Sequence, residues 1–458
     1  MNKTVSKVKI VGCTDCGERI CAAGGRISTL SGNADAILAK SLDPEKNASL
    51  IGKVTASGHT SIIEHISFNL AFTDVSVLVE QFMIEFRLAS FTVKSRRYVD
   101  FSDSGFFVPP LAESNETERF IQTMKRRFED YSRLITLGIP KEDARFVLPY
   151  CFYSNFICTL NGRELYHVLE AMLYGRGSRY PEIREIGRSL LAQAQELAPG
   201  IFKSFTGQSH PDTDSPLPGF SVDGSSKSSK CHSADKTELL ACTPDAEALV
   251  IRTAMIEAAC YSPAEIDGVL RNPSQKKEAL ACAARSSRPR ALENVQFTFR
   301  LNGLSLSGIT HLVRHRMQSV QIPPLERSDP GYYVVPQSIR ENPEAMELYS
   351  AAFREAGEYS RQVPEEIRAY TLLSGNTLDV VATMNGRELL LFLRLRTCNR
   401  AQWEIREYAV EMLLKLRGEY PMLFSLYGPS CCVLGYCPEG RLTCGRIREV
   451  QHKFCPAE

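Results

Sequence analysis

The sequence carries one series of short blocks twice, and this duplication restricts the folds open to the chain more than any other feature. Matching positions lie 229 residues apart at first, and 224 and then 222 residues apart later in the chain. Blocks that keep their order with so small a drift indicate two tandem copies of one module rather than chance similarity between helices. The matching blocks are 64–90 with 293–319, NGREL at 161–165 with 385–389, and EIR at 182–184 with 404–406.

The residues between the two copies predict the domain boundary. The segment SPLPGFSVDGSSKSSK at 215–230 is rich in serine, glycine and proline, and it has too few apolar residues for a packed core. A chain of 458 residues also suits two or three domains, each with its own core. We therefore predict a first module at 1–202, a linker at 203–245, a second module at 246–428 and a cysteine-rich tail at 429–458.

Periodicity predicts that each module mixes strands and helices, so that the fold class is α/β (α+β). Residues 66–72 and 295–301 largely alternate apolar and polar side chains and contain many β-branched or aromatic residues, which is typical of strands. Each predicted strand leads into a stretch with apolar residues at helical spacing. We expect helices at 77–86, 163–173 and 182–197 in the first module, and at 306–315, 387–395 and 404–416 in the second.

Composition and charge disfavour several classes of protein. Hydrophobic residues make up 43% and charged residues 23%, which is ordinary for a soluble globular protein. The net charge of +1 provides no overall field for nucleic acid or an anionic membrane, so an anionic ligand needs locally placed arginines. No apolar run approaches the roughly 18 to 20 residues that span a bilayer, and the N-terminus lacks a signal-peptide core. We therefore expect a cytoplasmic protein whose cysteines are thiols or metal ligands.

The most informative segment for chemistry is Arg314-His315-Arg316, at the predicted end of a helix in the second module. Two arginines that leave a helix toward a loop can hold the oxygens of a phosphate or a ribityl chain through their planar guanidinium groups. The imidazole between them can hydrogen-bond to a flat ring or stack on it. The alternative is a solvated basic helix end, which the helix dipole favours.

The surrounding blocks resemble the signature of the flavin-dependent thymidylate synthases. HLVRHRMQS at 311–319 is similar to the family's RHR segment, and the first module contains GHTSIIEH at 58–65, which is similar to its GHxSxxEH block. RLASFTVKSRRY at 87–98 resembles the family's R-x-A-S-F-x-x-x-S-x-R-Y segment. ARFVLP at 144–149, both NGREL blocks and AQWEIR at 401–406 also match. The resemblance covers nearly all of both copies and excludes the extreme N-terminus, the linker and the tail.

This resemblance implies a fold, cofactors and an activity. Each module is expected to contain a mostly antiparallel sheet packed by helices. Members of the family bind FAD and methylate dUMP at C5 to give dTMP, with methylenetetrahydrofolate and NADPH as co-substrates. They use no protein nucleophile, so no catalytic residue is expected. The hydride passes through the flavin, and the protein supplies orientation and electrostatics.

The resemblance also assigns roles to individual residues. Flavin-contacting positions are expected at His59, Ser61, Glu64, Arg314, His315 and Arg316. Substrate-binding positions are expected at Ser95, Arg97, Arg163, Arg184, Arg387 and Arg406. Within that set, Ser95 and Arg97 match the residues that hold the nucleotide phosphate, for which a hydroxyl and a guanidinium make a compact clamp. For the arginines of the NGREL and EIR blocks the alternative is ordinary salt bridging on a helix surface.

Neither module keeps the whole signature, and the losses are complementary. In the first module the RHR triplet has become Glu85-Phe86-Arg87. In the second module Pro324 stands where the first has Ser95, and Glu326 stands where the first has Arg97. The second module also replaces two histidines of the GHxSxxEH block by Arg288 and Asn294, and its His311 stands at the usual glutamine.

Since the family's active sites lie between subunits of a tetramer, complementary losses suggest shared sites. We expect the two modules to form a pseudo-dimer, and two chains to form a homodimer that acts as a pseudo-tetramer. Its composite sites would combine Ser95 and Arg97 with 314–316, and only half of the family's sites would be functional. Two alternatives remain at this stage: a flavin- or nucleotide-binding protein that has lost catalysis, or the same chemistry on a different pyrimidine nucleotide.

The tail is rich in cysteine and suggests a metal site. The thiolates of Cys432, Cys437, Cys444 and Cys455 suit a structural zinc ion, although their spacing is not a standard zinc pattern. Cys13, Cys16 and Cys21 offer a second candidate. A nucleic-acid-binding knuckle is a third function class, for which the tail has basic residues but few interleaved aromatic ones.

Overall fold

The computed structural model describes residues 6–207, 217 and 235–454. The chain divides into two compact units, and each is described by itself. Unit 1 comprises residues 1–227 and 335–375, and unit 2 comprises residues 228–334 and 376–458. Most of the predicted linker lies outside the described residues. Among the helices of the described ranges, none is long and apolar enough to cross a membrane.

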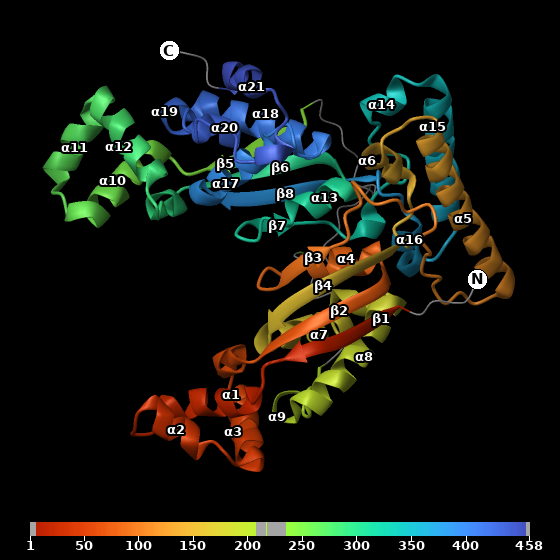
Figure 1. Cartoon of the computed structure of the whole chain (residues 1–458), viewed down its shortest axis with the longest axis horizontal. Coiled ribbons are helices and arrows are strands. Elements are labelled where there is room, and N and C mark those ends of the chain that lie inside the picture. Colours follow the sequence, from red (N-terminus) through yellow and green to blue (C-terminus); the bar gives the residue numbers. More distant parts are fainter. Residues whose placement is uncertain (1–5, 208–216, 218–234, 455–458) are drawn as a thin grey trace. The chain divides into compact units, whose positions relative to one another are not determined.

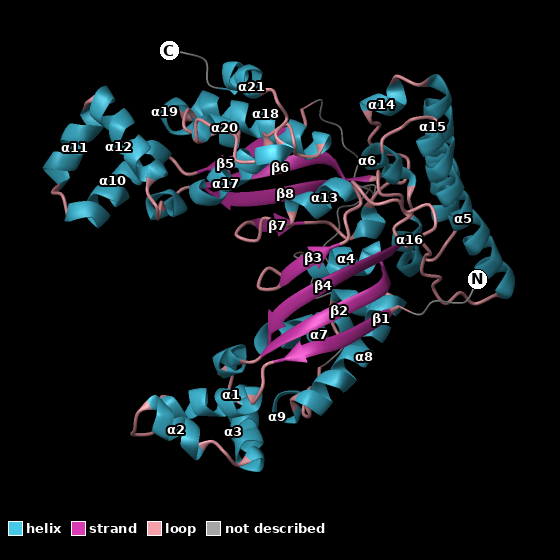
Figure 2. Ribbon diagram, viewed as in Figure 1, coloured by secondary structure: helices cyan, strands magenta, loops and turns pink. Residues whose placement is uncertain are grey.

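Unit 1 contains a four-stranded antiparallel sheet in the order β1-β2-β4-β3. Figure 2 shows these strands side by side, with α7 and α8 beside the sheet. The strands are β1 (Lys7–Cys13), β2 (Ser67–Ser76), β3 (Ser90–Val93) and β4 (Tyr153–Asn161). The first repeat's helices are α1 (Gly17–Ile27), α2 (Ala34–Lys40), α3 (Pro44–Ala56), α4 (Val77–Ile84), α5 (Ser114–Thr136), α6 (Lys141–Ala144), α7 (Gly162–Leu173), α8 (Pro181–Leu197) and α9 (Pro199–Phe202), with short 3₁₀ turns η1 (Thr60–His65), η2 (Arg145–Val147) and η3 (Arg176–Arg179).

Unit 2 repeats this arrangement with a four-stranded antiparallel sheet in the order β5-β6-β8-β7. Its strands are β5 (Thr237–Cys242), β6 (Gln296–Ser305), β7 (Ser319–Gln321) and β8 (Thr377–Asn385). Its helices are α10 (Ala246–Ala259), α11 (Pro263–Arg271), α12 (Pro273–Arg285), α13 (Leu306–Leu312), α17 (Gly386–Arg396), α18 (Trp403–Glu419), α19 (Pro421–Phe424), α20 (Ser430–Val433) and α21 (Ile447–Phe454), with 3₁₀ turns η4 (Arg290–Asn294), η5 (Leu325–Arg327) and η6 (Gly440–Leu442).

The predicted α/β class, with antiparallel sheets packed by helices, is confirmed. Alternate side chains of β2 and β6 are buried, as the alternation of their sequences predicts. Both strands also contain a register shift at the same repeat position, between Phe72 and Val75 in β2 and between Leu301 and Leu304 in β6. A shared irregularity of this kind is a feature of one inherited backbone.

Local geometry explains the asparagine and the glycine that begin each NGREL block. Asn161 begins α7 by accepting a hydrogen bond from the Glu164 N–H at 2.9 Å, and Asn385 begins α17 in the same way at 2.8 Å. A Cβ atom on the glycine that follows would lie 2.6 Å from a backbone oxygen in the first repeat and 2.8 Å in the second. The block is therefore a helix start under a tightly packed backbone.

Strand β5 lies inside the range that we assigned to the linker. Its residues Thr237–Cys242 pair with β6, so the second sheet begins before residue 246. The serine-rich composition used to place the boundary ends at about residue 230, and the short alternating segment after it is a strand. Cross-strand hydrogen bonds with a distant partner determine this element.

The second repeat contributes residues 335–375 to unit 1, and this segment pairs with the first repeat in a reciprocal manner. The Tyr150 N–H donates to the Leu372 carbonyl at 2.7 Å, and the Ser374 N–H donates to the Leu148 carbonyl at 2.9 Å. Positions 150 and 374 are repeat equivalents, as are 148 and 372. Contacts that exchange equivalent positions are characteristic of a twofold interface between like subunits. A second reciprocal pair follows: the Cys151 N–H donates to the Tyr370 carbonyl at 3.0 Å, and the Gly375 N–H donates to the Phe146 carbonyl at 2.9 Å.

A pair of equivalent helices extends this pseudo-twofold contact. The segment contains α14 (Gln337–Arg340), α15 (Pro343–Ser360) and α16 (Glu365–Thr371). Helix α15 lies beside α5, its counterpart from the first repeat (Figure 1). The Arg127 guanidinium is buried between them and donates to the Ala352 carbonyl at 2.5 Å and to Glu355 at 2.8 Å. Unit 1 is therefore completed by a helical arm of the second repeat.

Candidate functional site

The Arg314–Arg316 segment follows a fully buried helix. Helix α13 ends at Leu312, and the next residues form turns. Arg314 and Arg316 are exposed, whereas His315 is buried. Two guanidinium groups therefore emerge from a loop whose middle residue is buried.

His315 is held by protein partners on both ring nitrogens. Its Nε2 accepts a hydrogen bond from Arg396 Nε at 2.9 Å, and its Nδ1 lies 3.3 Å from Glu388 Oε1. The His315 ring also packs edge-on against the Phe392 ring, with the two ring centroids 4.9 Å apart. Burial lowers the pKa of His315, so the imidazole is neutral and carries its proton on Nδ1. It orients the loop between the two arginines instead of presenting its face to solvent.

The equivalent segment of the first repeat is closed by its own side chains. Glu85, which replaces the first arginine, accepts a hydrogen bond from Arg176 Nη1 at 2.5 Å and another from Gln81 at 3.0 Å. The Arg176 guanidinium also lies over the Phe82 ring, 4.8 Å from its centroid. A carboxylate with its own arginine is a poor place for a further anion. The loss of the triplet is therefore a structural replacement as well as a sequence change.

Ser95 and Arg97 lie on one short loop after β3. The Arg97 N–H donates to Ser95 Oγ at 3.3 Å, which ties the two residues together. The Arg97 guanidinium forms an ion pair with Glu142 of α6 and lies over the Tyr98 ring. The Arg97 guanidinium is therefore held beside Ser95, with the carboxylate of Glu142 as its ion-pair partner.

The glutamate of the EH block and the arginine of the NGREL block pair in both repeats. Glu64 and Arg163 are 2.7 Å apart, and Glu293 and Arg387 are 2.5 Å apart. All four side chains are substantially exposed, so each pair contributes at most about 1 kcal/mol to stability. His59 and Ser61 are also exposed, at the start of the turn that carries Glu64. In both repeats the paired glutamate and arginine are accessible to solvent.

The EIR blocks contain a buried residue whose role the sequence did not reveal. Glu404 accepts hydrogen bonds from the Ser305 N–H at 2.8 Å and the Ser305 hydroxyl at 2.6 Å, and Ser305 caps the start of α13. In the first repeat Glu182 accepts from the Ser76 N–H at 2.8 Å, and Ser76 caps α4. In the sequence, only the presence of the same glutamate in both repeats indicated that this residue has a structural role. Glu404 thus positions the helix that leads to Arg314.

Glu182 should make stability depend on pH. Burial raises its pKa to about 7, and its Oε2 has no hydrogen-bond partner among the described residues. In the unfolded chain this glutamate has a pKa near 4.5. Between pH 4.5 and 7 the folded state therefore binds more protons than the unfolded state, so stability falls as pH rises through this window. In the native protein this rise in pH should lower the free energy of unfolding by at most about 3 kcal/mol. Glu182→Gln, which mimics the protonated acid, should not show this decrease. Urea unfolding of both proteins at pH 5 and pH 8 measures the free energy of unfolding. The same change between the two pH values in both proteins would contradict the prediction.

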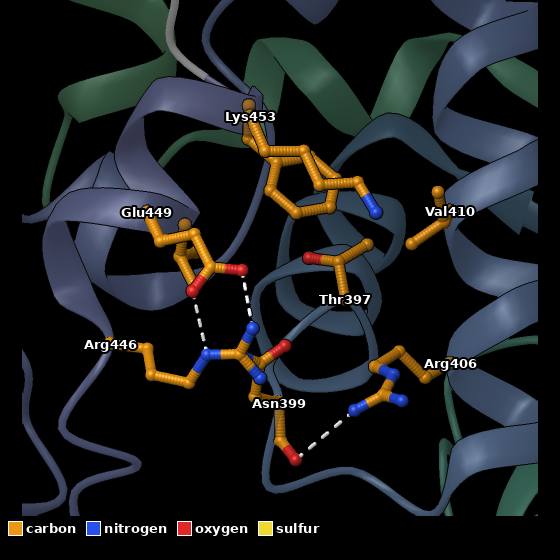
Figure 3. Close-up of a pocket in the computed structure, with 9 residues that line it drawn as sticks. Thr397, Asn399, Arg406, Val410, Arg446, Glu449 and Lys453 are labelled. Atoms are coloured by element: carbon orange, nitrogen blue, oxygen red, sulfur yellow. Dashed lines mark hydrogen bonds and ion pairs between the residues drawn. The ribbon is translucent and has the colours of Figure 1, made fainter.

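The arginines of the EIR blocks brace the loops before their own helices. Arg184 Nη1 donates to the Ser178 carbonyl at 3.0 Å, and Arg406 Nη1 donates to the Asn399 carbonyl at 3.3 Å. Arg406 also lines a cavity of about 230 Å³ between the second module and the tail helix α21 (Figure 3). Arg446 and Glu449 of the tail form an ion pair at the edge of this cavity. Among the described residues, neither Arg184 nor Arg406 forms a hydrogen bond with another expected site residue.

The expected zinc site does not form among the described residues. Cys432 Sγ lies 3.9 Å from the Val450 carbonyl, and Cys444 Sγ lies 3.9 Å from Asn399 Nδ2, so the two thiols have different protein partners. Cys455 lies outside the described residues. No group of three potential ligands, including the N-terminal cysteines, is found within residues 6–207 and 235–454. Since Cys455 is not among the described residues, the four-cysteine zinc site stays a prediction.

Comparison with known proteins assigns the two repeats to one family. The family described as thymidylate synthase complementing protein matches residues 9–200 and again residues 238–422. The chain belongs to this family. The second match begins within β5, in agreement with the paired strand, and the tail lies beyond both matches.

Relatives of the family align with about half of the chain, as a duplicated sequence requires. The flavin-dependent thymidylate synthase of Geobacter sulfurreducens is 36% identical over 231 residues, which are 48% of this chain and 97% of that protein. The flavin-dependent thymidylate synthase of Clostridium tetani is 33% identical over 242 residues, 47% of this chain and 95% of that protein. A solved UMP/dUMP methylase from Streptomyces cacaoi, bound with 5-Br dUMP, matches at 23% identity with a TM-score of 0.38 over 45% of this chain and 97% of that one.

Proposed function

We propose that this thymidylate synthase complementing protein methylates dUMP to dTMP, using FAD, methylenetetrahydrofolate and NADPH. The proposed sites are composite: the first repeat supplies Ser95 and Arg97 for the nucleotide phosphate, and the second supplies Arg314 and Arg316 for the flavin. The observation that carries the proposal is the complementary loss. Glu85 and Arg176 close the first repeat's triplet, and a buried Glu326 stands at the second repeat's phosphate position.

The reciprocal hydrogen bonds within unit 1 support a pseudo-dimer of repeats. Equivalent positions of the two copies exchange donor and acceptor, as they do when two identical subunits meet on a twofold axis. A fused dimer of this kind needs one further copy of itself to reproduce a tetramer of modules. We therefore propose a homodimer of chains that functions as a pseudo-tetramer.

The residues of the second repeat's triplet fit the anionic part of FAD. Two exposed guanidinium groups flank a buried neutral imidazole, so the positive charge of the loop is directed outward. Planar donors on a rigid loop hold phosphate oxygens at small entropic cost. The bound flavin supplies hydride transfer, and this chain's residues hold and orient the substrates. A Glu388–His315–Arg396 contact keeps the loop in place.

Two measurements on the purified full chain test the proposal. A visible spectrum with flavin absorbance and a content of one FAD per chain is expected, because only half of the family's sites are functional. Incubation with C5-tritiated dUMP and all co-substrates is expected to release tritium. Four FAD per two chains would contradict composite sites. Bound flavin without tritium release would instead support a binding protein or a different pyrimidine substrate.

A further inference from the structure

The loop that carries Ser95 and Arg97 is anchored by the residue between them. The Arg96 side chain is buried, and its Nη2 lies 2.9 Å from Glu80 Oε1 of α4. Ser154 of β4 donates to the other oxygen of Glu80 at 2.5 Å. We call these three residues the ionic anchor. It ties the loop to a helix and to a central strand of the sheet.

The second repeat has an apolar anchor at the same three positions. Repeat equivalence places Ile309 at the position of Glu80 and Leu325 at the position of Arg96. Leu378 replaces Ser154, since strand pairing joins Val75 to Ser154 and its equivalent Leu304 to Leu378. All three apolar side chains are buried. The same fold therefore accepts either a charged or an apolar trio at this place.

Stability alone gives no reason to keep the charged trio. Burying an ion pair requires the removal of water from both charges, and apolar residues of similar size often replace such pairs without loss of stability. Arg96 Nη1 also lacks a hydrogen-bond partner among the described residues, which adds to the cost of burial. The ionic anchor occurs in the repeat that retains Ser95 and Arg97. The apolar anchor occurs in the repeat that has Pro324 and Glu326 instead.

We propose that Arg96 is a positioning residue for nucleotide phosphate binding, and that Glu80 and Ser154 hold it in the required orientation. This inference rests on the proposed function. A guanidinium that donates to a fixed carboxylate determines the rotation of its loop as well as its depth, because the hydrogen bond is directional. Apolar packing is not directional and determines depth only. Ser95 and Arg97, on either side of Arg96, thereby hold a fixed spacing for one phosphate.

The decisive experiment transfers the second repeat's anchor into the first. The triple variant Glu80→Ile/Arg96→Leu/Ser154→Leu should melt near the native temperature, because this trio already packs in the second repeat. The dissociation constant for radiolabelled dUMP, measured by equilibrium dialysis on the full chain, is expected to rise at least about tenfold. Binding of deoxyuridine, which has no phosphate, should change less than twofold. In turnover, KM for dUMP should rise with little change in kcat.

Matched variants separate positioning from general destabilisation. Leu325→Ala truncates the anchor of the second repeat's loop, which lacks the clamp, and should leave dUMP affinity unchanged. A triple variant that binds dUMP within twofold of the native protein would overturn the proposal, and so would an equal loss in Leu325→Ala. If the triple variant does not fold, Glu80→Gln, which keeps the shape and removes the charge, is judged by the same criterion.

A third set of outcomes distinguishes this inference from the proposed function. Arg97→Ala removes the clamp guanidinium itself and should abolish measurable dUMP binding. Failure of the native chain to bind dUMP would refute the proposed function and the positioning role together. Native binding that is lost in Arg97→Ala but retained in the triple variant would leave the function standing and refute only the role of Arg96.

Discussion

Replacing Arg127 by alanine is expected to lower the free energy of unfolding by about 3–5 kcal/mol. The guanidinium is almost fully buried between α5 and α15, where it donates to the Ala352 carbonyl and contacts both Asp130 and Glu355. Without it, a backbone acceptor and a buried carboxylate lose their partner in a place that water does not reach. Urea unfolding followed by far-ultraviolet circular dichroism measures the change.

The neighbouring arginine provides the control for this prediction. Arg126 pairs with the same Glu355 at 3.3 Å, but its side chain is 64% exposed. Arg126→Ala should therefore change the unfolding free energy by less than about 1 kcal/mol. Equal effects of the two substitutions would show that the buried contact between α5 and α15 stabilises the fold no more than the exposed one. The proposed fused dimer would then lose one of its structural supports.

Removing both arginines of the second repeat's triplet is expected to abolish flavin binding. In Arg314→Ala/Arg316→Ala, each lost charge-assisted hydrogen bond is worth about 1.5–3 kcal/mol, so FAD affinity should fall by roughly 10²- to 10⁴-fold. Both side chains are exposed, and His315 still anchors the loop, so the melting temperature of the flavin-free protein should change little. Flavin absorbance after gel filtration, compared with the native chain, measures the loss.

Arg87→Ala is the matched control in the first repeat. Arg87 is the last arginine of the triplet there and is also exposed, but its neighbours are Glu85 and Phe86. If only the second repeat's triplet holds flavin, this variant should retain the native flavin content. Loss of flavin in Arg87→Ala, or its retention in the double variant, would mean that the assignment of the triplets is wrong.

Much of the secondary structure was predictable because it depends on local pattern. The alternation in 66–72 and 295–301 corresponds to β2 and β6, and helix starts at Asn161 and Asn385 follow from capping chemistry. Strand β5 was missed because a short segment beside a serine-rich region has no strong pattern of its own. Its hydrogen bonds to β6, more than 50 residues away in the chain, define it.

The candidate site was predictable at the level of residue type and less so at the level of role. Family motifs drew attention to the arginines of the EIR blocks, yet the structure buries the glutamates against the caps of α4 and α13. His315 was expected to hydrogen-bond to a flat ring or to stack on it, and the structure adds that Arg396, Glu388 and Phe392 surround the imidazole. Arg96 was hidden between two motif residues. Burial and partner choice depend on elements far away in the sequence, so no local motif contains them.

The sequence by itself determined that one module occurs twice, that its strands and helices follow in a given order, and that each copy lacks a different part of the signature. These properties depend on residue identity and on spacing along the chain. Only the tertiary structure decided that the second repeat's α15 completes unit 1, that Glu85 is neutralised by Arg176, and that Arg96 is buried against Glu80. The physical reason is that a charge acquires its role from the groups within a few ångströms of it, and those groups come from different elements of the fold.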